Sequence, residues 1–213
     1  MILSCLWIKA QTPVVFRASD WKLLDSLPVQ GYALAADQLN NTYLALKDDQ
    51  LLKLDPKHRE QFRYSDNFLG PVGHIDATNP INLLVFYPDF LTITILDRTL
   101  NPLATIDLLG MGYQFVEVAA RASAGGVWIY DPVSFTLRNI QKDGKAVAVS
   151  NDLSLQFPRG FEPVKLVEFN NQLWLQTRQQ GILVFNLFGG FIRQIPLPEG
   201  EERDLTYCYI NYL

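Results

Sequence analysis

The sequence repeats one short pattern four times, and this repeat limits the possible folds more than any other feature. In each copy a turn residue precedes a short apolar strand, and the copies are Asn41–Leu46, Ile81–Phe86, Gly125–Tyr130 and Asn171–Gln176. The third residues of the copies lie 40, 44 and 46 residues apart. A second apolar strand follows each copy and ends at Asp55, Asp97, Gln141 or Asn186, at intervals of 42, 44 and 45 residues. Two markers with the same period indicate a structural unit of 40–45 residues.

Each unit has room for four strands. An apolar stretch precedes every copy of the pattern and another follows it, with turns such as Lys47-Asp48-Asp49 and Lys142-Asp143-Gly144 between strands. A lone four-stranded antiparallel sheet cannot bury both of its faces, whereas sheets packed radially cover one another. We therefore predict an all-β fold, a β-propeller with about four complete four-stranded blades in one domain, 11–213. The blades are expected at about 31–70, 71–112, 113–160 and 161–199. A β-sandwich or barrel with regular strand spacing is the alternative.

The two ends of the chain supply further strand patterns. Val14–Arg17 and Trp21–Leu24 are expected to be outer strands of a partial blade, and Leu205–Ile210 an inner strand. The chain stops at Leu213, directly after this apolar strand. We therefore expect a truncated chain or an incomplete ring. An incomplete ring predicts pairing with another chain through exposed strand edges, which would make the protein a structural subunit.

Charge and composition exclude several classes of function. Eighteen Lys and Arg residues stand against 22 Asp and Glu residues, and no basic cluster is longer than two residues. Binding of nucleic acid through phosphate neutralisation is therefore not expected. Cys5 and Cys208 lie at opposite ends of the chain and only two histidines are present, so we predict no disulfide framework, no metal site and no cofactor. No stretch has 18 uninterrupted apolar residues, so no transmembrane helix is expected.

The N-terminus suggests export. Residues 2–8 are apolar and Lys9-Ala10-Gln11 follows, so 1–10 resembles the remnant of a signal peptide with Ala10 as the last cleaved residue. Two alternatives remain, a lipid anchor at Cys5 and an ordinary first strand. Export predicts a periplasmic, outer-membrane-associated or secreted protein.

One central segment is similar to a known group of proteins. An Asn79-Pro80 turn, the strand end Phe86-Tyr87-Pro88-Asp89-Phe90 and the strand Ile95-Leu96-Asp97 follow one another as in uncharacterised exported propeller-like proteins of Bacteroidota. The resemblance extends from about Gly31 to Leu213. It implies an envelope or secreted location and a propeller of the YVTN, NHL or quinoprotein-like kind, related in architecture to WD repeats. It implies no catalytic residues.

A few polar residues on the expected inner strands could face a central channel. His74 and Asp76 are two residues apart and could support general-base chemistry, and Glu117 and Glu168 occupy similar positions on two other blades. No nucleophile-elbow sequence accompanies them. A packed strand histidine is the favoured interpretation of His74. The enzymatic hypothesis is a propeller-type hydrolase or lyase with these four residues at its central channel.

The favoured hypothesis is a non-enzymatic binding or scaffolding module of the cell envelope with a protein or glycan partner. The turn Tyr87-Pro88-Asp89-Phe90 is its candidate recognition surface, because Tyr87, Asp89 and Phe90 are expected at a hairpin tip where burial is difficult. For the turn itself the favoured interpretation is that Tyr87 and Phe90 fold back onto their own blade, and the recognition surface is the alternative. Trp128 and Trp174 share one strand position, held by Leu44 and Leu84 in the other copies, and are interpreted as packing residues.

Overall fold

The computed structural model describes residues 30–66 and 68–196, and within them every sheet has four consecutive antiparallel strands. The first sheet contains β1 (Gly31–Ala36), β2 (Thr42–Leu46), β3 (Gln50–Leu54) and β4 (Glu60–Ser65). The second contains β5 (His74–Asp76), β6 (Leu83–Tyr87), β7 (Thr92–Leu96) and β8 (Pro102–Asp107). The third contains β9 (Ala119–Arg121), β10 (Val127–Asp131), β11 (Thr136–Ile140) and β12 (Ala146–Val149), and the fourth β13 (Pro163–Phe169), β14 (Gln172–Thr177), β15 (Gly181–Asn186) and β16 (Phe191–Ile195).

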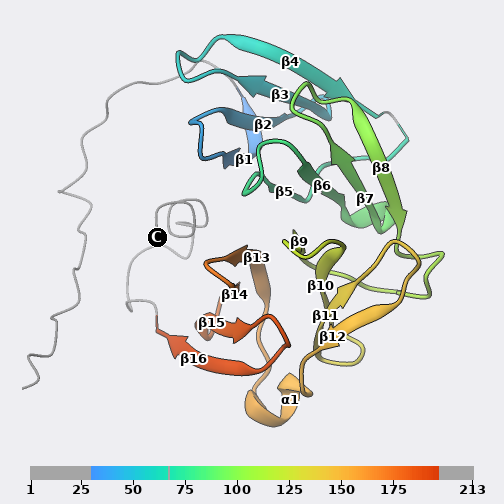
Figure 1. The fold of residues 1–213 in the computed structure, drawn as a ribbon, viewed down its shortest axis with the longest axis vertical. Coiled ribbons are helices and arrows are strands. Elements are labelled where there is room, and N and C mark those ends of the chain that lie inside the picture. Colours follow the sequence, from blue (N-terminus) through green and yellow to red (C-terminus); the bar gives the residue numbers. More distant parts are fainter. Residues whose placement is uncertain (1–29, 67, 197–213) are drawn as a thin grey trace, which may run out of the picture.

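The four sheets are the blades of a β-propeller (Figure 1). The first strand of each sheet lies nearest the centre, and these inner strands contact one another in chain order, β1 with β5, β5 with β9 and β9 with β13. The fourth strand of each sheet lies outermost. The predicted fold of four complete four-stranded blades is therefore confirmed, and the sandwich or barrel alternative is wrong.

Apolar side chains fill the space between successive blades. Alternate residues of one strand face opposite neighbours, so Leu83 and Val85 pack toward the first blade and Leu84 and Phe86 toward the third. Every residue of β6 is buried for this reason. A third cluster, which includes Trp128, joins the third and fourth blades. The blades thus form a series in which each interior blade is covered on both faces.

The strand register corrects one alignment made from the sequence. Tyr43 pairs with Lys53, Leu84 with Ile95, Trp128 with Asn139, and Trp174 with Val184. The second residue of each pair lies two positions before Asp55, Asp97, Gln141 or Asn186. Tyr43, and not Leu44, is therefore the first blade's counterpart of Trp128 and Trp174. The packing role predicted for the two tryptophans holds, because Trp128 is fully buried and Trp174 nearly so.

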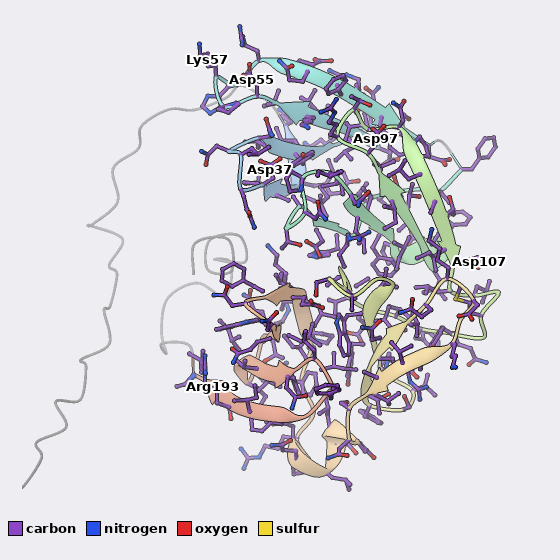
Figure 2. The ribbon with its side chains drawn as sticks, viewed as in Figure 1. Asp37, Asp55, Lys57, Asp97, Asp107 and Arg193 are labelled. Carbon is purple, nitrogen blue, oxygen red and sulfur yellow. The ribbon has the colours of Figure 1, made fainter. Side chains whose placement is uncertain are left out.

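The outer hairpin is the most regular element of the repeat. In each blade the last residue of the third strand, or the residue directly after it, accepts a backbone hydrogen bond from the residue three positions later, which has a positive φ. The four turns begin at Asp55, Asp97, Gln141 and Asn186, and the positive-φ residues are His58, Leu100, Gly144 and Gly189. The carboxylates of Asp55 and Asp97 also accept backbone N–H groups of their own turns, and both residues are labelled in Figure 2. These side chains fix the turn geometry, which explains why they mark the repeat.

The outer hairpins of the second, third and fourth blades also contact the blade before them or the connection that follows it. Leu100 packs in the cluster between the first and second blades. Gly144 lies beside the Met111 side chain, which follows the second blade. Gly189 lies so close to the backbone of Ser150, after the third blade, that a Cβ there would be 2.6 Å from the Ser150 nitrogen. The turns therefore join neighbouring blades as well as neighbouring strands.

Helices are few in the part of the chain that the structure describes. They are the one-turn 3₁₀ helix η2 (Pro88–Phe90) and the four-residue helix α1 (Leu153–Gln156). Between residues 30 and 196, with residue 67 left aside, no helix is long and apolar enough to cross a membrane. The signal-peptide remnant, Cys5 and the predicted terminal strands at 14–17, 21–24 and 205–210 lie outside the described residues.

Candidate functional site

Asp76 lies on the inner strand of the second blade, where its carboxylate joins two blades. One oxygen accepts hydrogen bonds from the backbone N–H and the hydroxyl of Thr78, at 2.9 and 2.7 Å. The other accepts the backbone N–H of Arg121, on the inner strand of the third blade, at 2.8 Å. The side chain is buried. Both oxygens of Asp76 are therefore engaged in structure, and a general base would need one of them free.

Glu168 does the same between the third and fourth blades. One carboxylate oxygen accepts the backbone N–H of Ser123 at 3.1 Å and the hydroxyl of the same residue. The other accepts the indole N–H of Trp128 at 2.8 Å. These donors lie 45 and 40 residues before Glu168, so they belong to the preceding blade. The contacts explain why a carboxylate occupies this inner strand.

His74 faces the fourth blade from the inner strand of the second. Burial and the nearby Lys165 ammonium lower the pKa of His74 to about 4, against the opposing effect of Asp76. Its Nε2 atom is buried and makes no hydrogen bond within the described residues. His74 is thus neutral at pH 7, and the charged group that sequence analysis missed beside it is Lys165, a buried residue of β13.

Glu117 does not join the other three residues. It precedes β9 and is exposed, so its predicted placement on an inner strand is wrong. Partial burial and the Glu162 carboxylate raise its pKa. Among residues 30–66 and 68–196, no group of three or more His, Cys, Asp or Glu side chains is arranged to hold a metal ion. Of the four candidate channel residues, Asp76 and Glu168 therefore bridge blades, His74 is half-buried, and Glu117 is a surface carboxylate.

The turn between β6 and β7 divides its predicted surface residues into two sets. Tyr87 is buried against the first blade, and burial raises the pKa of its hydroxyl. The prediction that Tyr87 lies on a recognition surface is therefore wrong. Asp89 and Phe90 remain on the surface, and 53% of Phe90 is exposed. Pro88 starts the 3₁₀ turn that directs the two residues outward.

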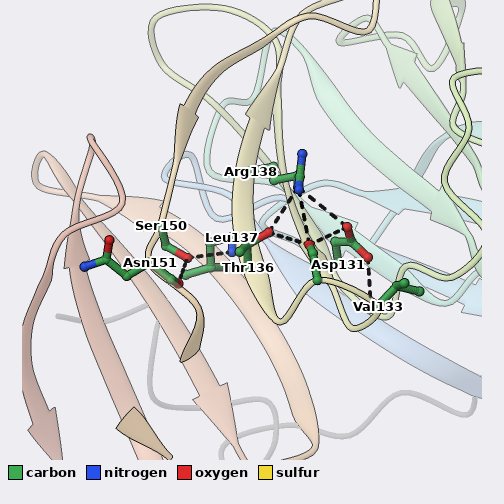
Figure 3. A network of polar contacts seen from close by, with 8 residues as sticks. Asp131, Val133, Thr136, Leu137, Arg138, Ser150 and Asn151 are labelled. Atoms are coloured by element: carbon green, nitrogen blue, oxygen red, sulfur yellow. Dashed lines mark hydrogen bonds and ion pairs between the residues drawn. The ribbon is translucent and has the colours of Figure 1, made fainter. Parts of the chain in front are cut away.

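The third blade has a matching turn, which sequence analysis missed. Pro132–Phe135 connects β10 to β11 and exposes Val133 and Phe135. Asp131 accepts the Val133 backbone N–H at 3.0 Å and the Ser134 hydroxyl at 2.6 Å (Figure 3). Arg138 closes the network through Ser134 and an ion pair with Asp131 at 3.5 Å. A proline directly after a buried strand, followed by an aromatic residue, is the signal common to both turns.

The corresponding turns of the other two blades have a different character. They are Lys47-Asp48-Asp49 in the first blade and Arg178-Gln179-Gln180 in the fourth. The apolar turns thus belong to the second and third blades alone among the four that the structure describes. The β8–β9 connection links the two blades, and its Leu108 donates its backbone N–H to the carbonyl of Leu91. An exposed phenylalanine, Phe115, lies on the same connection.

Comparisons with known proteins address the fold. No family model and no curated protein matches the sequence. Among solved structures, the Neurospora crassa Pan2 WD40 domain matches with a TM-score of 0.55 at 10% identity, over 78% of this chain and 50% of that one. A Bacteroides caccae protein of unknown function matches with a TM-score of 0.54 at 12% identity, over 76% and 59%. A streptogramin B lyase structure matches with a TM-score of 0.52 at 11% identity, over 80% and 55%.

This chain therefore spans between half and three fifths of each of these structures. At such low identity the similarity concerns the architecture and carries no residue roles, because β-propellers support both scaffolds and enzymes. The chain has the β-propeller fold that these proteins share.

Proposed function

We propose that the protein is a non-enzymatic binding or scaffolding module of the cell envelope that recognises a protein or glycan partner. The observation that carries this proposal is the pair of apolar turns, Pro88–Phe90 and Pro132–Phe135. Both present aromatic side chains to solvent from a rigid support. Exposed aromatic residues on an ordered surface are typical of interaction sites.

The state of the candidate catalytic residues supports binding over catalysis. The oxygens of Asp76 and Glu168 accept hydrogen bonds across blade boundaries, and removing these bonds for proton transfer would expose buried donors. WD40 propellers are among the structural neighbours. The envelope location is proposed from the sequence of residues 1–11, with the periplasm, the outer membrane or the exterior of the cell as the compartment.

Affinity capture tests both parts of the proposal. The tagged full chain would be recovered from the envelope fraction of its native cells, and its intact mass and its co-purifying molecules measured. We expect a stoichiometric partner and a chain that begins at Gln11. A matched variant, Ala10→Asp, should block the cleavage and retain residues 1–10, because a charged residue does not fit the position before the cut. Recovery from the cytosol with Met1 intact and no partner would overturn the proposal.

A further inference from the structure

The connections at one end of the strands combine exposed apolar side chains with negative charge. Those that border the second and third blades are Asp66, 68–73, 88–91, 108–118 and 132–135, and together with α1 we call them the loop face; the turns 47–49 and 178–180 at the same end are polar and lie outside it. Hydrogen bonds join parts of the loop face, since Leu108 donates to Leu91 O and Leu153, in α1, donates to Phe135 O. The exposed apolar residues of this face are Phe68, Phe90, Leu109, Phe115, Val133, Phe135 and Leu155.

The charge on the four connections has one sign. They contain Asp66, Asp89 and Glu117 and no lysine or arginine. The outer hairpins, which leave the opposite ends of the strands, carry both signs of charge: Lys57, Arg59, Arg98, Lys142 and Lys145 stand beside Asp55, Asp97 and Asp143. A cationic partner is therefore attracted to the loop face more strongly than to the hairpins, where charges of both signs alternate.

Two features prepare this face for binding. The turn at Pro132–Phe135 is held by the Asp131, Ser134 and Arg138 network, so little conformational freedom is lost when a partner binds. The raised pKa of Glu117 reflects its partial burial and repulsion from the neighbouring Glu162 carboxylate. A cation bound beside the two carboxylates would reduce this repulsion. The geometry points to a basic peptide segment with interspersed aromatic or aliphatic side chains as the occupant of the loop face. This inference rests on the proposed binding function and names its surface and partner chemistry.

Selection from a phage-displayed library of random 12-residue peptides tests the inference on the full chain. We expect the enriched peptides to combine Lys or Arg with aromatic or aliphatic residues. Synthetic copies of them should lose about tenfold or more in affinity for the variant Phe90→Ser/Phe135→Ser/Leu155→Ser. The matched control, Leu39→Ser/Ile81→Ser/Phe188→Ser, removes three apolar residues elsewhere on the molecule that are at least as exposed and should leave the affinity unchanged.

A second variant separates loss of binding from loss of folding. Asp89→Lys/Glu117→Lys keeps every apolar residue and reverses two surface charges, so it should fold normally and bind the basic peptides about tenfold more weakly at low salt. Enrichment of acidic peptides, or equal binding by the test and control variants, would overturn the inference while leaving the proposed function intact. Failure of the proposed function itself is seen separately, as the absence of any partner in affinity capture.

Discussion

The carboxylate of Glu168 accepts the indole N–H of Trp128 at 2.8 Å across the boundary between the third and fourth blades. We expect Glu168→Gln to lower the free energy of unfolding by about 1–3 kcal/mol, because the glutamine amide has one acceptor oxygen for two groups of donors. Urea denaturation measures this change. The control is Glu162→Gln, which breaks a surface ion pair with Arg178 and should cost less than about 1 kcal/mol. Equal losses in the two variants would contradict a bridging role for Glu168.

Lys53 is buried in the first blade at the position that Ile95 and Val184 hold in the second and fourth blades. Its ammonium group donates to the carbonyl of Arg98 at 2.7 Å and lies over the Tyr43 ring. Burial lowers the pKa of this lysine, so keeping the ammonium group charged inside the blade costs free energy.

We expect Lys53→Met to change stability by less than about 1 kcal/mol or to increase it, because methionine keeps the apolar stem and removes the cost of burying the ammonium group. Lys53→Ala should cost about 2 kcal/mol through lost packing. Thermal unfolding of the two variants would distinguish the contribution of the apolar part of the Lys53 side chain from that of its ammonium group. A large loss of stability in the methionine variant would show that the ammonium group itself is stabilising.

The desolvated imidazole of His74 makes stability depend on pH. Its pKa of about 4 in the folded chain is below the ordinary value of 6.5, so the unfolded chain binds the proton more tightly. The stabilising contribution is complete above pH 6.5 and is lost as the pH falls toward 4. Between pH 7 and pH 5 we expect a loss of about 1–2 kcal/mol in urea unfolding, and His74→Gln should lack most of it. His58→Asn is the matched control, since His58 is exposed; its pH dependence should follow that of the parent chain.

Two turn glycines should differ in their tolerance of a side chain. Gly189 and Gly144 occupy the same turn position at φ values of 84° and 80°, so alanine is strained equally at both. A Cβ at Gly189 would also lie 2.6 Å from the backbone nitrogen of Ser150, whereas a Cβ at Gly144 meets only the flexible Met111 side chain at 3.3 Å. Gly144→Ala should therefore cost about 1 kcal/mol and Gly189→Ala about 2 kcal/mol or more. Thermal unfolding of the two variants measures these losses of stability. Identical losses would mean that the backbone around Ser150 can shift to accommodate the new Cβ at position 189.

Much of the fold follows from local chemistry that a single sequence displays. Asp55 and Asp97 mark the ends of third strands because their carboxylates order the turns that follow, and this role fixes their spacing. In the first blade the alignment is displaced by one residue, from Tyr43 to Leu44, because Tyr43–Leu46 are apolar at every position. Alternation of polar and apolar residues, which would fix the register, is therefore absent.

The candidate site was less accessible to prediction. Asp76 and Glu168 were correctly placed on inner strands, but the backbone donors of Arg121 and Ser123 that occupy their oxygens come from other blades. Because every residue except proline has a backbone N–H, nothing in the sequence marks Arg121 or Ser123 as the donors to these carboxylates. The burial of Tyr87 likewise depends on the space left by the first blade. The exposure of Phe135 could have been anticipated from the proline turn before it.

The contacts of the outer hairpins have a direction along the chain. Leu100 and Gly189 each meet a blade that precedes their own in the sequence. During synthesis, a newly emerged blade therefore finds its docking surface already made and need not wait for residues still to be translated. Propellers depend on contacts between distant segments around a ring, which slow folding. In this protein the principal contacts between blades join consecutive units, so the order of translation is also a workable order of assembly.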